Sequence, residues 1–391
     1  MDLIIDKSKL EDKRISIAIM SSFAILMIQY LILVYFNFID TSKGEIVQLI
    51  SKGIVGFLYL LALPIVLKRN KIKFIGLYFI ASFLFICNYF FFNENYIYIK
   101  SIILPFFFTG LPSYIYAYSI RDWDIFAEVM RKAGNIVFIV GTILGLLVVT
   151  GNASIGTYSM SLSYYMLLPS IIYMNDFLDK MHLKSGVILG VSLLIILALG
   201  SRGALMCIGA FAILKLIKQV SRLTYKNIML YLLLFFVIFI SLIFWDGILE
   251  YIYNFLLRYG IKSRSIILFL QGEIYLSGRD ILYKNVIKEI LNNPLLGIGL
   301  SGDRRVLGGI YVHNIFIEIL SNFGVVLGSY IIILLIYVVI KSLLREKSRK
   351  YNIIIIWISI GFIHLLVSSS YLIDFKFWIF LGLLSKNSKV T

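Results

Sequence analysis

The stretch ISIAIMSSFAILMIQYLILVYFN at residues 15–37 decides the class of fold. It contains no charged residue and is long enough to cross a bilayer as a helix, which takes about 20 residues. The apolar run is too long for a cleaved signal peptide and lacks a small-residue cleavage pattern. We therefore interpret 15–37 as a retained first transmembrane helix.

The rest of the chain repeats this pattern. Of the 391 residues, 60% are hydrophobic and 15% are charged, whereas a soluble domain is about 45–50% apolar and about 25% charged. This composition excludes a soluble globule and a disordered chain. It predicts an all-α polytopic membrane protein, one membrane domain over 1–391, with about twelve transmembrane helices. The predicted spans are 15–37, 45–67, 74–92, 97–119, 134–150, 158–174, 185–200, 203–217, 227–245, 321–341, 352–370 and 373–385.

The positions of Lys and Arg predict the orientation. The net charge is +16, and the basic residues gather in alternate connections between the predicted spans. Cytoplasmic loops collect Lys and Arg, so both termini are expected in the cytoplasm. The same rule accounts for the positive charge without a nucleic-acid partner. The basic segments are the N-terminus, 68–73, 121–132, 175–184, 218–226, 341–350 and 386–391.

One outer connection differs from the others. Residues 246–320 form a long loop with eight Lys and Arg residues, against the rule for the outer side. Within it, 280–292 has helical spacing and predicts an amphipathic helix at the membrane interface, which Asn293-Pro294 ends. The expected apolar positions are Ile281, Val286, Ile290 and Leu291, and Gly297, Gly299 and Gly302 are expected to form a flexible turn. A second interfacial helix is expected at 122–132. The length and charge of the loop indicate that it carries the active site.

Arginines at the edge of the bilayer are candidate substrate ligands, because charges are costly there. Arg202 stands in the turn ALGSRGALM, where it either extends to lipid phosphates or faces a cavity and binds an anion. Arg279 opens the amphipathic helix and either pairs with Asp280 or binds substrate. Arg304 and Arg305 lie in GIGLSGDRRVLGG, a Gly-rich basic segment of a kind that can hold phosphate. Adjacent side chains diverge, so one of these two is expected at the site.

His313 opens the segment HNIFIEILSNFG on the same side. Asn314 and Glu318 are four residues apart and would share a helix face. His313 is either structural or the group that takes a proton, and Glu318 is a second candidate for that role. We interpret His182 and His364 as structural.

Several chemistries find no support in the chain. It has no HExxH, CxxC or GxSxG motif, and the outer loop has no DxD pair to hold Mg²⁺ against a diphosphate. Cys87 and Cys207 lie in apolar runs and are interpreted as small buried hydrophobes. The sequence therefore predicts a site without a metal or other cofactor, built on arginines that bind phosphate oxygens with a planar fork.

Three segments resemble the O-antigen ligase/polymerase superfamily of bacterial membrane proteins: GSRGALM at 200–206, SGRDILYKNVIKEILNNPLLGIG at 277–299 and HNIFIEILSNFGVVLG at 313–328. Their order and spacing match over roughly 195–345, and the first half is similar only in hydropathy. The resemblance implies a GT-C-like membrane glycosyltransferase at the outer face of the bacterial inner (plasma) membrane. Its substrates would be glycans linked to undecaprenyl diphosphate.

The resemblance also implies residue roles. Arg202 and Arg279 would bind the diphosphate, and His313 would be an active-site residue. Our own extension adds Arg304 and Arg305 to the diphosphate site, with Asn314 and Tyr283 in supporting roles.

Within the superfamily two functions remain open. A Wzy-type polymerase joins lipid-linked repeat units of an O-antigen or capsule, and a ligase moves the finished glycan of lipopolysaccharide onto lipid A core. The aromatic- and Ile-rich chain and its divergent first half favour the polymerase. A lipid-linked oligosaccharide flippase or transporter is less favoured, because no internal repeat is visible and the polar residues concentrate on one loop. The expected partners are the lipid-linked donor and acceptor, membrane lipid and a chain-length regulator.

Overall fold

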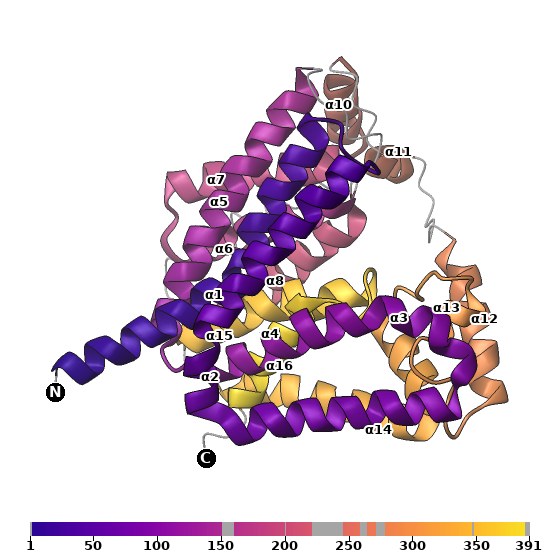
Figure 1. Ribbon diagram of the computed structural model, residues 1–391. Helices are drawn as coiled ribbons and strands as arrows, with labels where there is room; N and C mark the ends of the chain where they lie inside the picture. Colours follow the sequence, from indigo (N-terminus) through magenta and orange to yellow (C-terminus); the bar gives the residue numbers. More distant parts are fainter. Residues whose placement is uncertain are drawn as a thin grey trace. The chain divides into compact units, whose positions relative to one another are not determined.

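The computed structural model describes residues 2–150, 160–199, 201–220, 245–258, 264–270, 278–345 and 348–387 (Figure 1). Every regular element among these residues is a helix. The predicted span at 227–245 lies outside the described residues, apart from its last one.

The first part of the chain consists of long helices over the first five predicted spans. α2 runs through two of these spans and is broken at Asn70, whose backbone is not helical (φ −146°, ψ 38°). The interfacial helix expected at 122–132 is instead the beginning of a longer helix, α5, that continues into the next predicted span. The elements are α1 (Asp2–Tyr35), α2 (Ser42–Phe91), η1 (Asn93–Asn95), α3 (Tyr96–Pro105), η2 (Phe106–Gly110), α4 (Leu111–Ser119) and α5 (Trp123–Val149).

The second part combines apolar helices with short helices in the predicted outer loop. The amphipathic helix predicted at 280–292 is confirmed as α12. The elements are α6 (Met160–Lys180), α7 (Leu183–Ala198), α8 (Arg202–Val220), α10 (Trp245–Arg258), α11 (Arg264–Leu270), α12 (Arg279–Asn292), α13 (Gly302–Val306), α14 (Ile315–Arg345), α15 (Ser348–Trp357), η3 (Ile358–Phe362), η4 (Ile363–Leu366) and α16 (Phe375–Asn387).

Five helical segments of the described chain are long and apolar enough to cross a membrane. Two further apolar segments, Leu183–Ala198 and Lys350–Leu366, are shorter. The described residues therefore form an all-helical membrane protein, whereas about twelve spans and a GT-C-like fold remain predictions. The five segments are Lys7–Tyr35, Ser42–Phe91, Asn93–Ser119, Trp123–Val148 and Ile315–Leu344.

The chain divides into two compact units. The first comprises 1–21, 55–130 and 276–391, and the second comprises 22–54 and 131–275. In the first unit α16 packs closely along α4. Gly382 permits this approach, since a Cβ atom at this position would lie only 2.3 Å from the carbonyl oxygen of Tyr114. Buried aromatic residues, among them Tyr116, Trp357 and Phe380, fill the core around this contact.

The second unit is organised around α6, which packs against α7 and α8. Charged residues link its helices: Lys215 of α8 lies 2.7 Å from Asp179 of α6, and Arg131 of α5 forms an ion pair with Asp176 of α6. Arg202 is the first residue of α8, so this unit holds one of the predicted diphosphate ligands.

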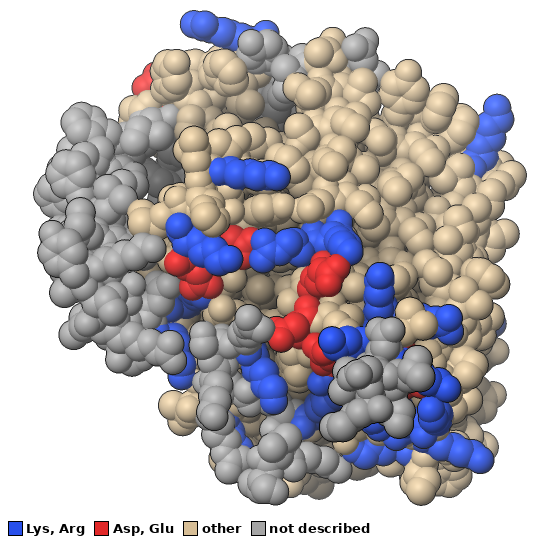
Figure 2. Space-filling model, turned by 90° about the vertical axis from the view of Figure 1, so that its left-hand side faces the viewer, with Lys and Arg blue, Asp and Glu red and all other residues tan. Residues whose placement is uncertain are grey.

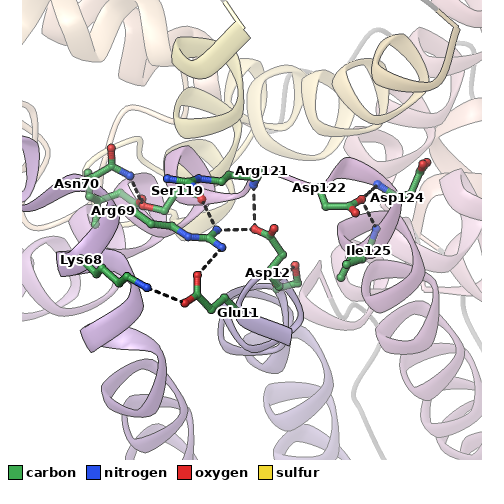
Figure 3. A network of polar contacts seen from close by, with 12 residues as sticks. Glu11, Asp12, Lys68, Arg69, Asn70, Ser119, Arg121, Asp122, Asp124 and Ile125 are labelled. Atoms are coloured by element: carbon green, nitrogen blue, oxygen red, sulfur yellow. Dashed lines mark hydrogen bonds and ion pairs between the residues drawn. The ribbon is translucent and has the colours of Figure 1, made fainter. Parts of the chain in front are cut away.

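Charged residues of the first unit form a network beside the break in α2 (Figure 3). The Arg69 guanidinium donates to Asp12 at 2.6 Å, to Glu11 at 2.9 Å and to the carbonyl oxygen of Ser119 at 2.9 Å. The backbone N–H of Arg121 donates to the same Asp12 oxygen at 2.9 Å. The network thus joins α1, α2 and the segment between α4 and α5. Figure 2 shows Lys and Arg, with some Asp and Glu, on the face that lies to the left in Figure 1.

Breaking this network is expected to destabilise the protein. The side chains of Arg69 and Asp12 are 3% and 1% exposed, so Asp12→Ala removes the nearest partner of a buried guanidinium that keeps Glu11, and should cost about 1.5–3 kcal/mol. Lys68→Ala is the control, because Lys68 is 68% exposed and its ion pair with Glu11 is worth about 0–1 kcal/mol. The melting temperatures of the two purified variants in detergent measure the loss of stability in each. Equal melting temperatures for the two variants would contradict the prediction.

Candidate functional site

α12 is held in place by a small core at the predicted outer loop. Val286 and Ile290, which are 0% and 3% exposed, pack with Val312 and are flanked by Tyr283. These residues of α12 are three or four apart and share one helix face. The prediction that Ile281 and Leu291 belong to this face is wrong, since they are 61% and 67% exposed. Both lie five residues from Val286, which turns them away at about 100° per residue.

The Gly-rich segment after α12 is held by Asn88, near the end of α2, and by Asn95 of η1. Gly297 and Gly299 have φ angles of 70° and 77°, which favour glycine. The Asn88 side-chain oxygen accepts a hydrogen bond from the N–H of Leu300 at 2.6 Å, and the Asn95 amide donates to the Leu300 carbonyl at 3.1 Å. The flexible turn expected here is therefore wrong, because buried hydrogen bonds fix the segment.

The side chain of Arg304 points into the first unit. It is 4% exposed, and its guanidinium lies 3.2 Å from Asp303 and 3.5 Å from Glu318. It also donates to the hydroxyl of Ser370 at 2.9 Å. Through these contacts Arg304 links α13 to α14 and to the segment before α16, and all of its partners are buried.

Arg305 points in a different direction, as expected for adjacent side chains. It donates to Glu94 at 2.8 Å and to Asn95 at 3.1 Å, both in η1. Its side chain is 36% exposed. Arg304 and Arg305 thus bind separate groups of residues.

Glu318 is 1% exposed, and both of its carboxylate oxygens have partners. One accepts from the hydroxyl of Ser370, and the other accepts from the N–H of Tyr371 at 3.2 Å. The carboxylate therefore ties α14 to residues 367–374, which connect η4 to α16. The polar run SSSY at 368–371, between two apolar segments, is the sequence signal that could have indicated this contact.

Asp303 is a second buried carboxylate beside the same guanidinium. It is 0% exposed and accepts a hydrogen bond from the N–H of Val312 at 3.1 Å. Burial raises the pKa of Asp303, and the positive charge of Arg304 opposes that rise. The hydrogen bond fixes the segment between α13 and α14 at Val312, which itself is 0% exposed.

Tyr311 and His313 flank Val312, and their rings meet. The ring centroids are 4.2 Å apart, and the guanidinium carbon of Arg304 lies 5.6 Å from the Tyr311 ring centroid. His313 has a φ angle of 58°, a left-handed backbone that residues other than glycine seldom adopt and that is found at functional sites. Its Nδ1 atom has no hydrogen-bond partner among the described residues.

Burial lowers the pKa of His313 to about 4, and the charges of Arg279 and Arg304 add to this effect. The imidazole is therefore neutral at pH 7 and can accept a proton. The same two arginines act on Tyr311. Arg279, Arg304 and the two rings thus share one electrostatic environment.

Arg279 is the first residue of α12, after Gly278 with a φ angle of 75°. It is partly exposed and forms no hydrogen bond or ion pair with another described residue, so the alternative pairing with Asp280 is not formed. The first turn of a helix also presents unpaired N–H groups that favour anions. Arg279 is therefore available to an anionic ligand.

The other predicted residues take different places. Asn314 does not lie within α14 but directly precedes it. Its side-chain oxygen accepts hydrogen bonds from the N–H groups of Phe316 at 3.0 Å and Ile317 at 3.2 Å. Arg202 belongs to the second unit, whereas Arg279, Arg304, His313 and Glu318 come together in the first. Sequence reasoning missed the remaining members of this group: Asp303, Tyr311, Ser370 and Tyr371.

Comparison with known proteins finds a family model that matches part of the chain. Residues 187–332 match the family model described as O-antigen ligase, and this match confirms the predicted resemblance to the O-antigen ligase/polymerase superfamily. No curated protein and no solved structure matches the chain. The matched residues include Arg202, Arg279, His313 and Glu318. The family indicates a membrane protein with an O-antigen ligase or polymerase type of function on lipid-linked polysaccharide.

Proposed function

We propose that the protein is a polysaccharide polymerase that joins repeat units linked to undecaprenyl diphosphate at the outer face of the bacterial inner membrane. The observation that carries the proposal is that Arg279, which has no partner among the described residues, acts electrostatically on the buried imidazole of His313, whose pKa is lowered to about 4. A glycosyl transfer from a lipid diphosphate needs both a proton acceptor and a fixed cation. The family match supplies the class of substrate.

In the proposed reaction a hydroxyl of the acceptor glycan attacks the anomeric carbon of the donor. A new C–O bond forms as the bond between that carbon and the diphosphate oxygen breaks, and undecaprenyl diphosphate leaves with the bonding electrons. His313 takes the hydroxyl proton. Arg279 binds the leaving diphosphate, whose negative charge grows in the transition state. Arg202 keeps its role in diphosphate binding on the resemblance alone.

Glu318 and Arg304 are better suited to positioning than to direct contact with substrate. Both oxygens of Glu318 accept hydrogen bonds, and Arg304 is surrounded by two carboxylates and a hydroxyl. A group that must take a proton or bind a diphosphate would first have to lose these contacts. We therefore assign the proton transfer to His313 and keep Glu318 as the alternative base.

A ligase that transfers the glycan to lipid A core is the second candidate, and the description of the matching family favours it. Both reactions use the same donor and the same leaving group, so the site described above serves either. They differ in the acceptor, which is another lipid-linked repeat unit for the polymerase. The distinction therefore needs the glycans of the cell.

Deleting the protein is expected to leave surface or lipid-linked glycan at a single repeat unit, because chain extension stops. Electrophoresis and mass spectrometry of the extracted glycans measure the length, and a plasmid copy of the wild-type protein should restore it. Long glycan that accumulates on the lipid carrier would instead establish the ligase. Lipid-linked glycan trapped on the inner face would establish a flippase and overturn the proposal.

A further inference from the structure

We propose that Tyr311 is a further substrate-contacting residue of this site. Its hydroxyl donates a hydrogen bond to the anionic group that Arg279 binds, and its ring keeps the imidazole of His313 away from water. The proposal rests on the proposed function, because it assigns Tyr311 to the same diphosphate and the same base.

The backbone between α13 and α14 aims Tyr311 and His313 in the same direction. Val312 is fully buried in the core under α12, and its N–H is bound by Asp303. Tyr311 and His313, the two neighbours of Val312, lie ring against ring, although the left-handed backbone of His313 (φ 58°) is not extended. The 4.2 Å between their ring centroids agrees with this arrangement. The core thus fixes Tyr311 and His313 as a pair.

The hydroxyl of Tyr311 is left available. The ring contacts His313 and Arg304, but the hydroxyl has no hydrogen bond to another described residue. Tyr311 is partly exposed, and its unpaired hydroxyl oxygen is not fully buried. A tyrosine with a half-buried ring normally finds a partner for its hydroxyl. The hydroxyl is therefore accessible to a ligand, and the charges that act on Tyr311 are those of Arg304, Arg279 and the carboxylates of Asp374 and Glu318.

The charges around Tyr311 favour a donor rather than an acceptor. Burial raises the pKa of its phenol, and the charges of Asp374 and Glu318 add to this rise, against the opposite effects of Arg304 and Arg279. The hydroxyl therefore keeps its proton at working pH and can donate a hydrogen bond to a phosphate oxygen. Arg279 supplies charge without a described partner, and Tyr311 adds a neutral donor whose ring is fixed by Arg304 and His313. Together they would hold a diphosphate in one orientation.

The hydroxyl is tested by binding of undecaprenyl diphosphate to the purified full-length protein in detergent. Tyr311→Phe keeps the ring and should weaken binding about tenfold or more, the effect of losing a hydrogen bond to a charged group. Tyr330→Phe on α14 is the matched control and should bind as the wild type does, because Tyr330 is 63% exposed and lies outside the site. The melting temperature of Tyr311→Phe should equal that of the wild type. Unchanged binding by Tyr311→Phe would overturn the role of the hydroxyl.

The ring is tested by the pH dependence of glycan transfer. Tyr311→Leu exposes the imidazole of His313 to water, so its pKa should rise from about 4 toward the ordinary value of 6.5. Activity should then be lost at a higher pH on acidification than in the wild type, whereas Tyr311→Phe should keep the wild-type profile. An unchanged profile in Tyr311→Leu overturns the role of the ring. Tyr311→Met replaces Tyr311→Leu if the latter does not fold.

Failure of this proposal differs from failure of the proposed function. If Arg279→Ala loses binding of undecaprenyl diphosphate and Tyr311→Phe does not, only the assignment of Tyr311 is wrong. If Arg279→Ala also binds normally, the diphosphate site itself is wrong.

Discussion

Replacing Arg279 with alanine is expected to reduce glycan transfer by about a hundredfold or more, while the protein still folds and inserts. Arg279 forms no hydrogen bond or ion pair with another described residue, so its loss should weaken ligand binding and leave the fold intact. Arg279→Lys should be severely impaired as well, because lysine keeps the charge but loses the fork that binds two phosphate oxygens. The measurement is glycan length in cells and transfer rate with purified protein, at equal protein level.

Lys288→Ala is the matched control for Arg279. It removes one positive charge from an exposed position on the same helix, α12, and should leave activity near that of the wild type. If the two alanine variants behave alike, the effect belongs to the net charge of the helix. Normal glycan length in Arg279→Ala would remove Arg279 from the site and with it most of the mechanism.

Replacing His313 with alanine is expected to slow transfer by about 10²–10⁴-fold, the usual contribution of a positioned proton acceptor. His182→Ala is the control, because His182 is exposed at the start of α7 and has no place in the proposed reaction. The rate of a single transfer with saturating substrate measures the effect. A wild-type rate in His313→Ala would leave Glu318 as the remaining candidate base.

The pH dependence gives His313 a second readout within the same prediction. A base works in its neutral form, so kcat/KM, which reports the free protein, should fall only as the pH approaches the His313 pKa of about 4. The bound diphosphate brings negative charge that opposes the effect of Arg279 and Arg304, and so raises the pKa of His313 in the complex. The acid limb of kcat should therefore lie at a higher pH than that of kcat/KM. Coincident limbs would contradict a base close to the diphosphate.

The amino-acid sequence by itself determined the helical membrane class, the break near residue 70 and the position of α12. These features depend on local properties: the length of an apolar run, a basic connection such as 68–73, and a proline after Asn293. The order of the three segments at 200–206, 277–299 and 313–328 likewise sufficed for the resemblance to the superfamily, which the match at 187–332 confirmed.

Only the tertiary structure decided which charged residues are left for a ligand. Arg304 and Arg279 look alike in the sequence, but Arg304 meets Ser370, 66 residues away, and Glu318 meets the same hydroxyl from 52 residues away. Arg305 meets Asn95 across 210 residues. Such partners cannot be read from spacing, because hydropathy and helical period describe neighbours along the chain. A buried ion pair instead depends on which distant segments fold together, and the pairing of Tyr311 with His313 depends on the burial of Val312 between them.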